Sequence, residues 1–518
     1  MDGDSSISAL GLALYAGLFA ASAGAAPDPD QSGTPAIQGA QLIALAEQHR
    51  PRALELFREF LSLPNDAHHP DDITRLIAWM EPQFRARGFA TRQLATAGNP
   101  TLYAERPASG AKRTVLVYLQ SDGQPVDPTA WQQPDPFVPV LKQESAAGWT
   151  IIPWSALDNG YDPDWRVFAR SAADSKGPMT QFLVALDLLA AADAAPAFNL
   201  KVIIDTEEEL GSPYLSALVA AHRDLLAADM LLIFDGPPHA SNRPTVSFGA
   251  RGMMTLTLTS YGPRVPQHSG HYGNFIPNPA WHLSHILASM KSMDGRVLIP
   301  GFYSGVKIDD ATASILQKVP DDPEQILADI GVAAPDRVGN SLQEALQYPS
   351  LNIRGLGSAW IGEQSRTIIP DRAVGELDIR LVVESDPDAL LALVRDHIAN
   401  LGYTVLDHEP TGEERRQYPH LVQLNSELSY RAFRSDFDAA PGKLARAGMR
   451  RLFGHEPILI RTMGGSIPIA PFVELLGIPA ATVPTVNIDN NQHSPNENLR
   501  LGNFVEGVAI IAAVLSER

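Results

Sequence analysis

Hydrophobic residues recur along the first half of this chain with two different spacings. Over residues 40–64 and 71–89 they return every three or four positions, which is the spacing of one face of a helix. Farther on, short apolar runs alternate with a longer stretch of helical spacing at 177–192. The apolar runs expected to form strands are 114–119, 200–205 and 230–234. This alternation predicts an α/β fold in which helices cover both faces of a sheet.

The pattern changes near residue 245, where longer strands with alternating polar and apolar residues begin. Strands are expected at 245–262 and 373–383, and helices at 278–291 and 386–402, which together describe an α+β unit. The last hundred residues return to α/β alternation and end in an apolar helix. We therefore expect one domain built from residues 40–244 and 413–518, with a second domain, residues 245–412, inserted into it.

The N-terminus has the pattern of a segment that directs export. Residues 8–25 are apolar and end in small side chains, so we expect a signal peptide at 1–25, followed by a linker containing Pro, Gly and Ser at 26–39. The chain starts Met-Asp-Gly-Asp, with acid where a signal peptide usually carries Lys or Arg, and a short N-terminal membrane anchor is the alternative. No later stretch is long and apolar enough to span a bilayer, so we expect a periplasmic protein without an integral membrane domain.

Charge and composition narrow the possible chemistry. The chain has 40 Lys+Arg against 59 Asp+Glu, a formal net charge of -19, which disfavours nucleic acid and anionic membranes as partners. It has no cysteine, which excludes disulfides, thiolate zinc sites and a cysteine nucleophile. The Gly-x-Ser-x-Gly elbow of many serine hydrolases is also missing. A metal would therefore have to be held by His, Asp, Glu or weaker oxygen donors.

Several polar residues follow the expected strands or lie between them. They are Gln120, Asp122, Asp174, Asp235 and the run Glu207 to Glu209. Because ligands of open α/β sheets bind at the carboxyl ends of the strands, we expect these side chains to gather at one edge of the sheet. Three consecutive glutamates repel one another, so either solvent or a cation must compensate their charge.

The motifs that contain these residues, taken in order, resemble a known enzyme family. They read ADSKG, EEELGS, LLIFDGPP and NNQHSPNENL, and three further segments read GPRVPQHSGHYGN, RTIIPDRAVGELDIRLV and MGGSIP. The set is similar to the co-catalytic zinc peptidases, which include carnosinases and other dipeptidases, succinyl-diaminopimelate desuccinylases and aminoacylases. The resemblance runs from about residue 40 to the C-terminus and is strongest for the dipeptidase branch. It implies a catalytic domain with a mixed sheet between helices, an inserted α+β lid and dimerisation domain, and a homodimer.

Carried over position by position, the resemblance implies roles for five residues. Asp174 would bridge two metal ions, Glu209 and His493 would complete the first metal site, and Asp235 would belong to the second. Glu208 would be the general base. If the motif is aligned one position earlier, Glu207 would be the general base and Glu208 the metal ligand.

The second metal site departs from the family at Gln120. The family's H-x-D motif here reads Gln120-Ser121-Asp122, so the histidine ligand is replaced by an amide. We therefore expect one firm zinc site, and a second site that is weak or holds manganese, magnesium or zinc. We also expect Asp122, which in the family orients the histidine, to accept a hydrogen bond from the Gln120 nitrogen and aim its oxygen at the ion. His239 is an alternative replacement ligand, although a turn histidine is the simpler interpretation.

The resemblance also implies three residues that contact the substrate. His268 would come from the partner subunit to stabilise the oxyanion, although it also fits a surface loop. Arg380 would bind a substrate carboxylate with its guanidinium fork, and a strand arginine in a salt bridge is the alternative. Ser466 lies in a glycine turn that brings the backbone close to the substrate, or it caps a helix.

Two other polar patterns are weaker candidates for metal sites. His282 and His285 lie three positions apart on an expected helix without a nearby carboxylate, which favours a helix surface. The aspartates at 158, 162 and 164 lack the spacing of a calcium loop and more simply line the rim of the pocket.

The predicted function is metal-dependent hydrolysis of the peptide or amide bond of dipeptides or small peptides. A metal-activated water would attack the carbonyl, with Glu208 as the general base. An N-acyl-amino-acid amidohydrolase is the alternative enzyme. The alternative outside catalysis is a binding protein with a degraded metal site.

Overall fold

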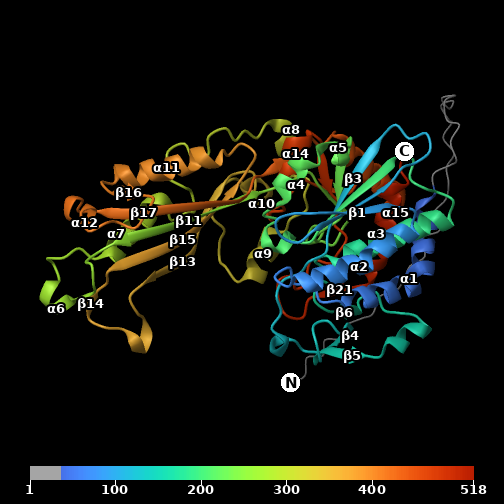
Figure 1. Cartoon of the computed structure of the whole chain (residues 1–518), viewed down its shortest axis with the longest axis horizontal. Helices are drawn as coiled ribbons and strands as arrows, with labels where there is room; N and C mark the ends of the chain where they lie inside the picture. Colours follow the sequence, from blue (N-terminus) through green and yellow to red (C-terminus); the bar gives the residue numbers. More distant parts are fainter. Residues whose placement is uncertain (1–36) are drawn as a thin grey trace, which may run out of the picture. The chain divides into compact units, whose positions relative to one another are not determined.

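A mixed sheet of eight strands forms the centre of the catalytic domain, as the sequence predicts. The computed structural model describes residues 37–518, so the expected signal peptide and almost all of the linker lie outside the described residues. Neighbouring strands run β1-β2-β7-β3-β8-β20-β9-β19 (Figure 1). The strands span Ala90–Leu94 (β1), Thr101–Arg106 (β2), Asn199–Asp205 (β7), Thr114–Gln120 (β3), Met230–Ile233 (β8), Ala480–Thr482 (β20), Thr245–Ser247 (β9) and Ile458–Ile460 (β19). The strands β7, β3, β8 and β20 are parallel, so their carboxyl ends meet at one edge.

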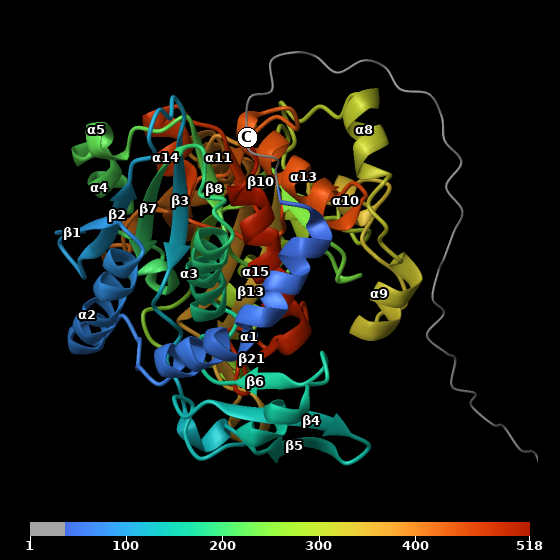
Figure 2. The same ribbon diagram turned by 90° about the vertical axis from the view of Figure 1, so that its right-hand side faces the viewer.

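Strand β3 shows why helices cover both faces of this sheet. Val117 and Leu119 pack into a core with helices on one face, whereas Leu116 and Tyr118 pack into a separate core on the other. Alternate residues of a strand point to opposite faces, so a run that is apolar throughout must be covered twice. The helices of the first core are Gly39–Leu61 (α1), Pro70–Ala86 (α2), Lys176–Ala191 (α3), Ala440–Phe453 (α13) and Leu501–Leu515 (α15). Those of the second are Leu215–Ala221 (α4), Arg223–Leu226 (α5) and Ala470–Leu476 (α14), as Figure 2 shows.

The inserted lid is built on a five-stranded sheet of order β13-β15-β11-β17-β16. Its strands span Ser350–Ser358 (β13), Arg372–Leu381 (β15), Gly252–Tyr261 (β11), Leu421–Tyr430 (β17) and Thr404–Leu406 (β16). Along β11, buried and partly exposed residues alternate strictly, which is the pattern of a sheet covered on one face. The covering helices are Pro279–Met290 (α7) and Pro387–Asn400 (α11), which share one core with the sheet.

The first expected boundary of the inserted domain, residue 245, is the first residue of β9 in the central sheet, and the second, residue 412, lies in a turn before the lid strand β17. The expected strand 245–262 is divided between two sheets, because β9 belongs to the central sheet and β11 to the lid. Gly249 and Gly252 allow this change of direction: a Cβ at either position would lie 2.5 Å from a backbone oxygen of the chain at 430–433. At the other end, β17 pairs with β11, so the lid sheet extends beyond residue 412 to Tyr430.

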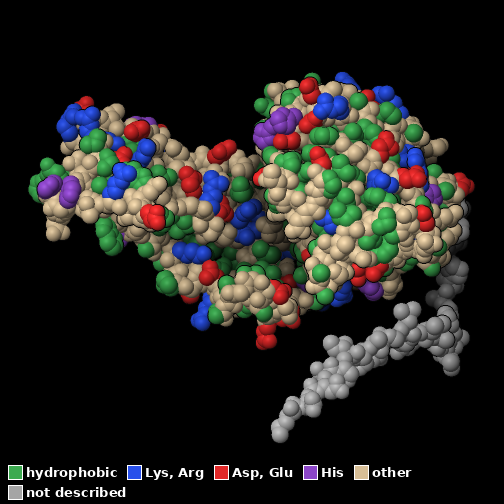
Figure 3. All heavy atoms as spheres, turned by 90° about the horizontal axis from the view of Figure 1, so that it is seen from below, with side chains coloured by type: hydrophobic (Ala, Val, Ile, Leu, Met, Phe, Trp, Pro, Cys, Tyr) green, Lys and Arg blue, Asp and Glu red, His purple; other side chains and the backbone are tan. Residues whose placement is uncertain are grey.

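A small four-stranded sheet supports the loop that carries His493. Its order is β21-β6-β4-β5, with bounds Asn498–Arg500 (β21), Arg166–Phe168 (β6), Val140–Ser145 (β4) and Gly148–Ile152 (β5). Acidic and basic side chains are interspersed over the surface seen in Figure 3. Within the described part of the chain, none of the helices has the length and apolar character needed to cross a bilayer.

Candidate active site

Asp174, Glu209 and His493 come together from three distant segments of the chain. One ligand atom of each lies within 4.8 Å of the others. His493 Nε2 is 3.0 Å from an oxygen of Asp174 and 3.3 Å from an oxygen of Glu209. Among residues 37–518 this is the one group of three or more such side chains close enough to hold a metal ion. Neither the His282 and His285 pair nor the aspartates at 158–164 form such a group.

The buried carboxylate of Glu497 fixes the turn that presents Asp174. It accepts hydrogen bonds from the backbone N–H groups of Ser171, Ala173 and Asp174, at 2.8 to 2.9 Å. Arg170 donates a further hydrogen bond to it at 2.7 Å. Burial raises the pKa of Glu497, and the Arg170 charge opposes that shift. Sequence reasoning missed Glu497, although the acid stands four residues after His493 within the motif NNQHSPNENL.

Asp122 positions the glutamate turn, not the amide of Gln120. Its two oxygens accept hydrogen bonds from the backbone N–H groups of Glu208, at 3.1 Å, and Glu209, at 3.0 Å. The expected hydrogen bond from Gln120 to Asp122 is therefore wrong, because both oxygens face the turn that follows the neighbouring strand β7. Glu207 points elsewhere and accepts from the backbone N–H of Asn99 at 2.9 Å. This leaves Glu209 in the group with Asp174 and His493, and Glu208 close to that group.

The carboxyl of Glu208 lies among other acids. Burial raises its pKa well above the usual value, and the nearby charges of Asp174, Glu209 and Asp235 raise it further. A carboxyl held beside the reacting water can accept a proton and later return it, which is the requirement for a general base that later acts as an acid.

Gln120 contacts Asp174 through its nitrogen. Its Nε2 donates to Asp174 Oδ1 at 2.6 Å, and its Oε1 is buried without a hydrogen-bond partner. Asp235 accepts a hydrogen bond from Ser175 Oγ at 2.6 Å, and burial raises its pKa to about 7. His239 does not replace the missing ligand, because its ring nitrogens contact Ser241 and Asp321, both at 2.9 Å.

The residues fit one metal ion better than two. Asp174, Glu209 and His493 would supply one nitrogen and two oxygen ligands, a donor set that suits a zinc ion. At the second position only Asp235 and an amide N–H accompany Asp174, and an N–H group cannot ligate a cation.

The lid contributes basic groups to the site. Arg380, on β15, donates to Ser466 Oγ at 2.9 Å. Its Nε lies 3.8 Å from Asp378, which is the ion pair of the alternative interpretation, and its substrate-binding role stays a prediction. Ser466 does not cap a helix, since α14 is preceded by Ile469. Burial and the Arg380 charge lower the pKa of Arg251 to about 10. Sequence reasoning missed Arg251, which lies between Ala250 and Gly252, directly before β11.

Tyr430, the last residue of β17, lies where the lid meets the acidic residues. Burial, together with the charges of Glu208 and Glu209, raises the pKa of its hydroxyl to about 12. A cavity of about 610 Å³ opens here and is lined by Glu209, Ser212, Tyr430 and Pro468, among others. Such a volume is in the range of small-ligand pockets. Tyr430 was also missed, because its place depends on a strand that the sequence assigned to the other domain.

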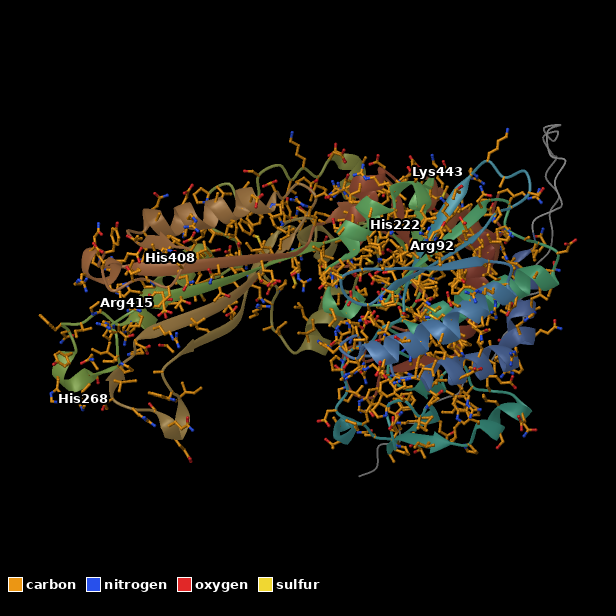
Figure 4. The ribbon with its side chains drawn as sticks, viewed as in Figure 1. Arg92, His222, His268, His408, Arg415 and Lys443 are labelled. Carbon is orange, nitrogen blue, oxygen red and sulfur yellow. The ribbon has the colours of Figure 1, made fainter. Side chains whose placement is uncertain are left out.

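His268 does not join the metal ligands of its own chain. It lies on the short strand Gln267–His268 (β12), which pairs with Ile368–Ile369 (β14) at the end of the lid farthest from the central sheet (Figure 4). The side chain is exposed, and its Nδ1 accepts from the backbone N–H of Gly270 at 3.0 Å. Any contact between His268 and the acidic site would have to involve a second subunit.

The sequence profile of Peptidase family M20/M25/M40 matches residues 138–517 of this chain. The chain belongs to Peptidase family M20/M25/M40. This confirms the predicted family and the prediction of a metallopeptidase. This chain is 26% identical to the human Beta-Ala-His dipeptidase over 424 residues. The alignment covers 81% of this chain and 77% of the dipeptidase. The chain is also 26% identical to the Cys-Gly metallodipeptidase of Schizosaccharomyces pombe, covering 79% of this chain and 80% of the relative.

Solved structures confirm the fold. An M20 family metallo-carboxypeptidase from Sulfolobus solfataricus matches with a TM-score of 0.74 and 26% identity, over 90% of this chain and 98% of that one. Human carnosine dipeptidase 1 matches with a TM-score of 0.71 and 23% identity, over 93% and 99% of the two chains. The catalytic domain with an inserted lid is therefore the architecture of this protein.

Proposed function

We propose that this protein is a metal-dependent dipeptidase that cleaves the peptide bond next to a free C-terminal carboxylate. The observation that carries the proposal is the group of Asp174, Glu209 and His493 with Glu208 beside it, in a member of a peptidase family. A zinc ion bound there would act as a Lewis acid and lower the pKa of a bound water.

Glu208 is the group that moves the proton. It accepts a proton from the attacking water as the water oxygen bonds to the peptide carbonyl carbon. It returns this proton to the amide nitrogen as the C–N bond breaks, which gives an amine and a carboxylic acid, and the acid then loses its proton to the amine or to solvent. Asp122 supports both steps indirectly, because it holds the backbone of Glu208 and Glu209 in place.

The basic groups of the lid bind the other end of the substrate in this proposal. Arg380 is one-third exposed and is held by Ser466, so its guanidinium can receive a carboxylate. Arg251 lies close enough for its pKa to be lowered by Arg380, and a bound anion would relieve the repulsion between the two cations. Both curated relatives described above are named dipeptidases, which supports small peptides as substrates.

Two further features complete the proposal. The exposed, distant position of His268 supports a homodimer in which each lid reaches the site of the partner subunit. Export to the periplasm rests on the apolar run of residues 8–25.

A panel of peptides tests the substrate assignment. We expect dipeptides with free termini to be hydrolysed, and the same dipeptides with a C-terminal amide to react far more slowly. Longer peptides that lose one residue at a time from the C-terminus would indicate a carboxypeptidase. Faster hydrolysis of N-acetyl amino acids than of dipeptides would favour the N-acyl-amino-acid amidohydrolase, and no hydrolysis of any substrate would contradict the proposal.

A further inference from the structure

The amide of Gln120 occupies the side of Asp174 that faces away from His493. Gln120 is the last residue of β3, is 2% exposed, and lies in the cluster of acids at the carboxyl edge of the central sheet. Its Nε2 donates to Asp174 Oδ1 at 2.6 Å, while His493 Nε2 contacts the other oxygen, Oδ2, at 3.0 Å. The two oxygens of Asp174 therefore have separate partners.

This arrangement excludes a bridging role for Asp174 as it stands. A carboxylate that bridges two ions must offer one oxygen to each, but Oδ1 already accepts the amide hydrogen of Gln120. With the amide reversed, two oxygens would face each other at that distance, which is favourable only with a cation between them. Asp235, the remaining acid, accepts the hydroxyl hydrogen of Ser175 at 2.6 Å.

We propose that this centre takes one metal ion per subunit, at Asp174, Glu209 and His493, and that the Gln120 amide stands where a second ion would bind. The positive end of the N–H dipole compensates part of the charge on Asp174 that the second ion would otherwise neutralise. The inference rests on the proposed function for the identity of the centre, and it deepens that function by fixing the metal count.

The buried Oε1 of Gln120, which has no hydrogen-bond partner, is the atom that could still ligate a cation. A hard ion such as manganese or magnesium accepts an amide oxygen more readily than zinc does. Metal content must therefore be measured with zinc and with manganese. An amide that turns its N–H toward the second position predicts one ion per subunit, whereas an amide that turns its oxygen there predicts a second ion.

The experiment measures metal per subunit on the full chain. The protein is stripped with a chelator, reloaded with zinc or with manganese, freed of excess metal by gel filtration, and analysed by plasma mass spectrometry. We expect one equivalent in the wild type with either ion. Gln120→His restores a nitrogen ligand beside Asp174 and Asp235, and we expect two equivalents of zinc. Gln317→His, which adds an exposed histidine on the lid insertion, is the matched control and should stay at one.

Two results would overturn the inference. One is a wild type that binds two equivalents of either ion with similar affinity, measured by calorimetric titration. The other is a Gln120→His variant that keeps the wild-type melting curve and still binds one. If this variant does not fold, Gln120→Glu provides the same test, because a glutamate oxygen in place of the amide N–H can ligate a cation together with Asp174 and Asp235, and we expect two equivalents here too.

The metal count is independent of the substrate. An enzyme that hydrolyses no dipeptide but binds one ion in the wild type and two in Gln120→His would contradict the proposed function and leave this inference standing. The reverse result, active dipeptidase with two ions in the wild type, would contradict only the inference.

Discussion

The two halves of the site carry opposite charge and come from different sheets. The central sheet places carboxylates at the ends of its parallel strands, where Asp122 and Glu497 hold the backbone of the residues beside the metal position. The lid supplies Arg380 from a sheet that is covered on one face only, and Arg251 lies directly before a strand of that sheet. In the proposed function, the acidic half carries out the chemistry and the basic half holds the anionic end of the substrate. Changes in the first should lower kcat, whereas changes in the second should raise KM.

The largest effect should follow from Glu208→Gln. The amide keeps the shape of the side chain but cannot accept a proton, so we expect kcat to fall by about 10²- to 10⁴-fold. Metal content should stay as in the wild type, because Glu208 is not one of the three grouped ligands. Glu207→Gln is the matched control, since that side chain faces Asn99, and it should keep most of the activity. Equal kcat values for both variants would remove Glu208 from the mechanism.

A smaller effect is expected from Glu497→Gln, which tests a positioning residue. The amide loses the charge that Arg170 and three backbone N–H groups bind, and the Asp174 turn should loosen. We expect the affinity for zinc to fall about 10- to 100-fold, with activity restored at high zinc concentration. Glu506→Gln, on α15, changes a partly buried glutamate elsewhere and should leave zinc affinity unchanged. Activity that zinc cannot restore would indicate a merely structural role.

The basic half is tested by Arg380→Lys. Lysine keeps the charge but loses the planar fork, so we expect KM for a dipeptide to rise about tenfold while kcat changes little. Arg354→Lys, an exposed arginine on the neighbouring strand β13, is the control. The variant should also discriminate less between a dipeptide and its C-terminal amide. Unchanged discrimination would place the carboxylate elsewhere.

The smallest effect should come from Ser466→Ala. It removes the 2.9 Å hydrogen bond that holds Arg380, but it changes neither the charge of Arg380 nor that of the substrate carboxylate. One hydrogen bond to a partly exposed group is worth about 1 kcal/mol, so KM should rise only a few-fold. In the Arg380→Lys variant, Ser466→Ala should not raise KM further, because the hydrogen bond between Ser466 and the guanidinium is already lost. An additive effect would mean that Ser466 contacts the substrate by itself.

Much of the acidic half could be predicted from the sequence, because strand ends are visible in the pattern. Apolar runs locate β3, β7 and β8, and parallel strands bring the residues that follow them to one edge. The hydrogen bonds of Asp122 and Glu497 could not be predicted in this way. They join side chains to backbone N–H groups of distant turns, and such contacts depend on how the strands are aligned.

The basic half was less predictable, because it depends on where one sheet ends and the other begins. Gly249 and Gly252 divide a single strand pattern between two sheets, and β17 returns to the lid after residue 412. Arg251 and Tyr430 lie at these two crossings, so their place in the site follows from tertiary structure and not from local spacing. The orientation of the Gln120 amide also could not be predicted, because the sequence does not determine whether its nitrogen or its oxygen faces Asp174.

The most direct test of the account is removal and return of the metal in one preparation. The protein is dialysed against a chelator until its metal content, measured by plasma mass spectrometry, is close to zero, and dipeptide hydrolysis is followed before and after stepwise addition of zinc. We expect hydrolysis to fall to background and to return in proportion to the first equivalent of zinc. Unchanged hydrolysis by the metal-free protein would contradict a site in which Asp174, Glu209 and His493 hold the catalytic ion.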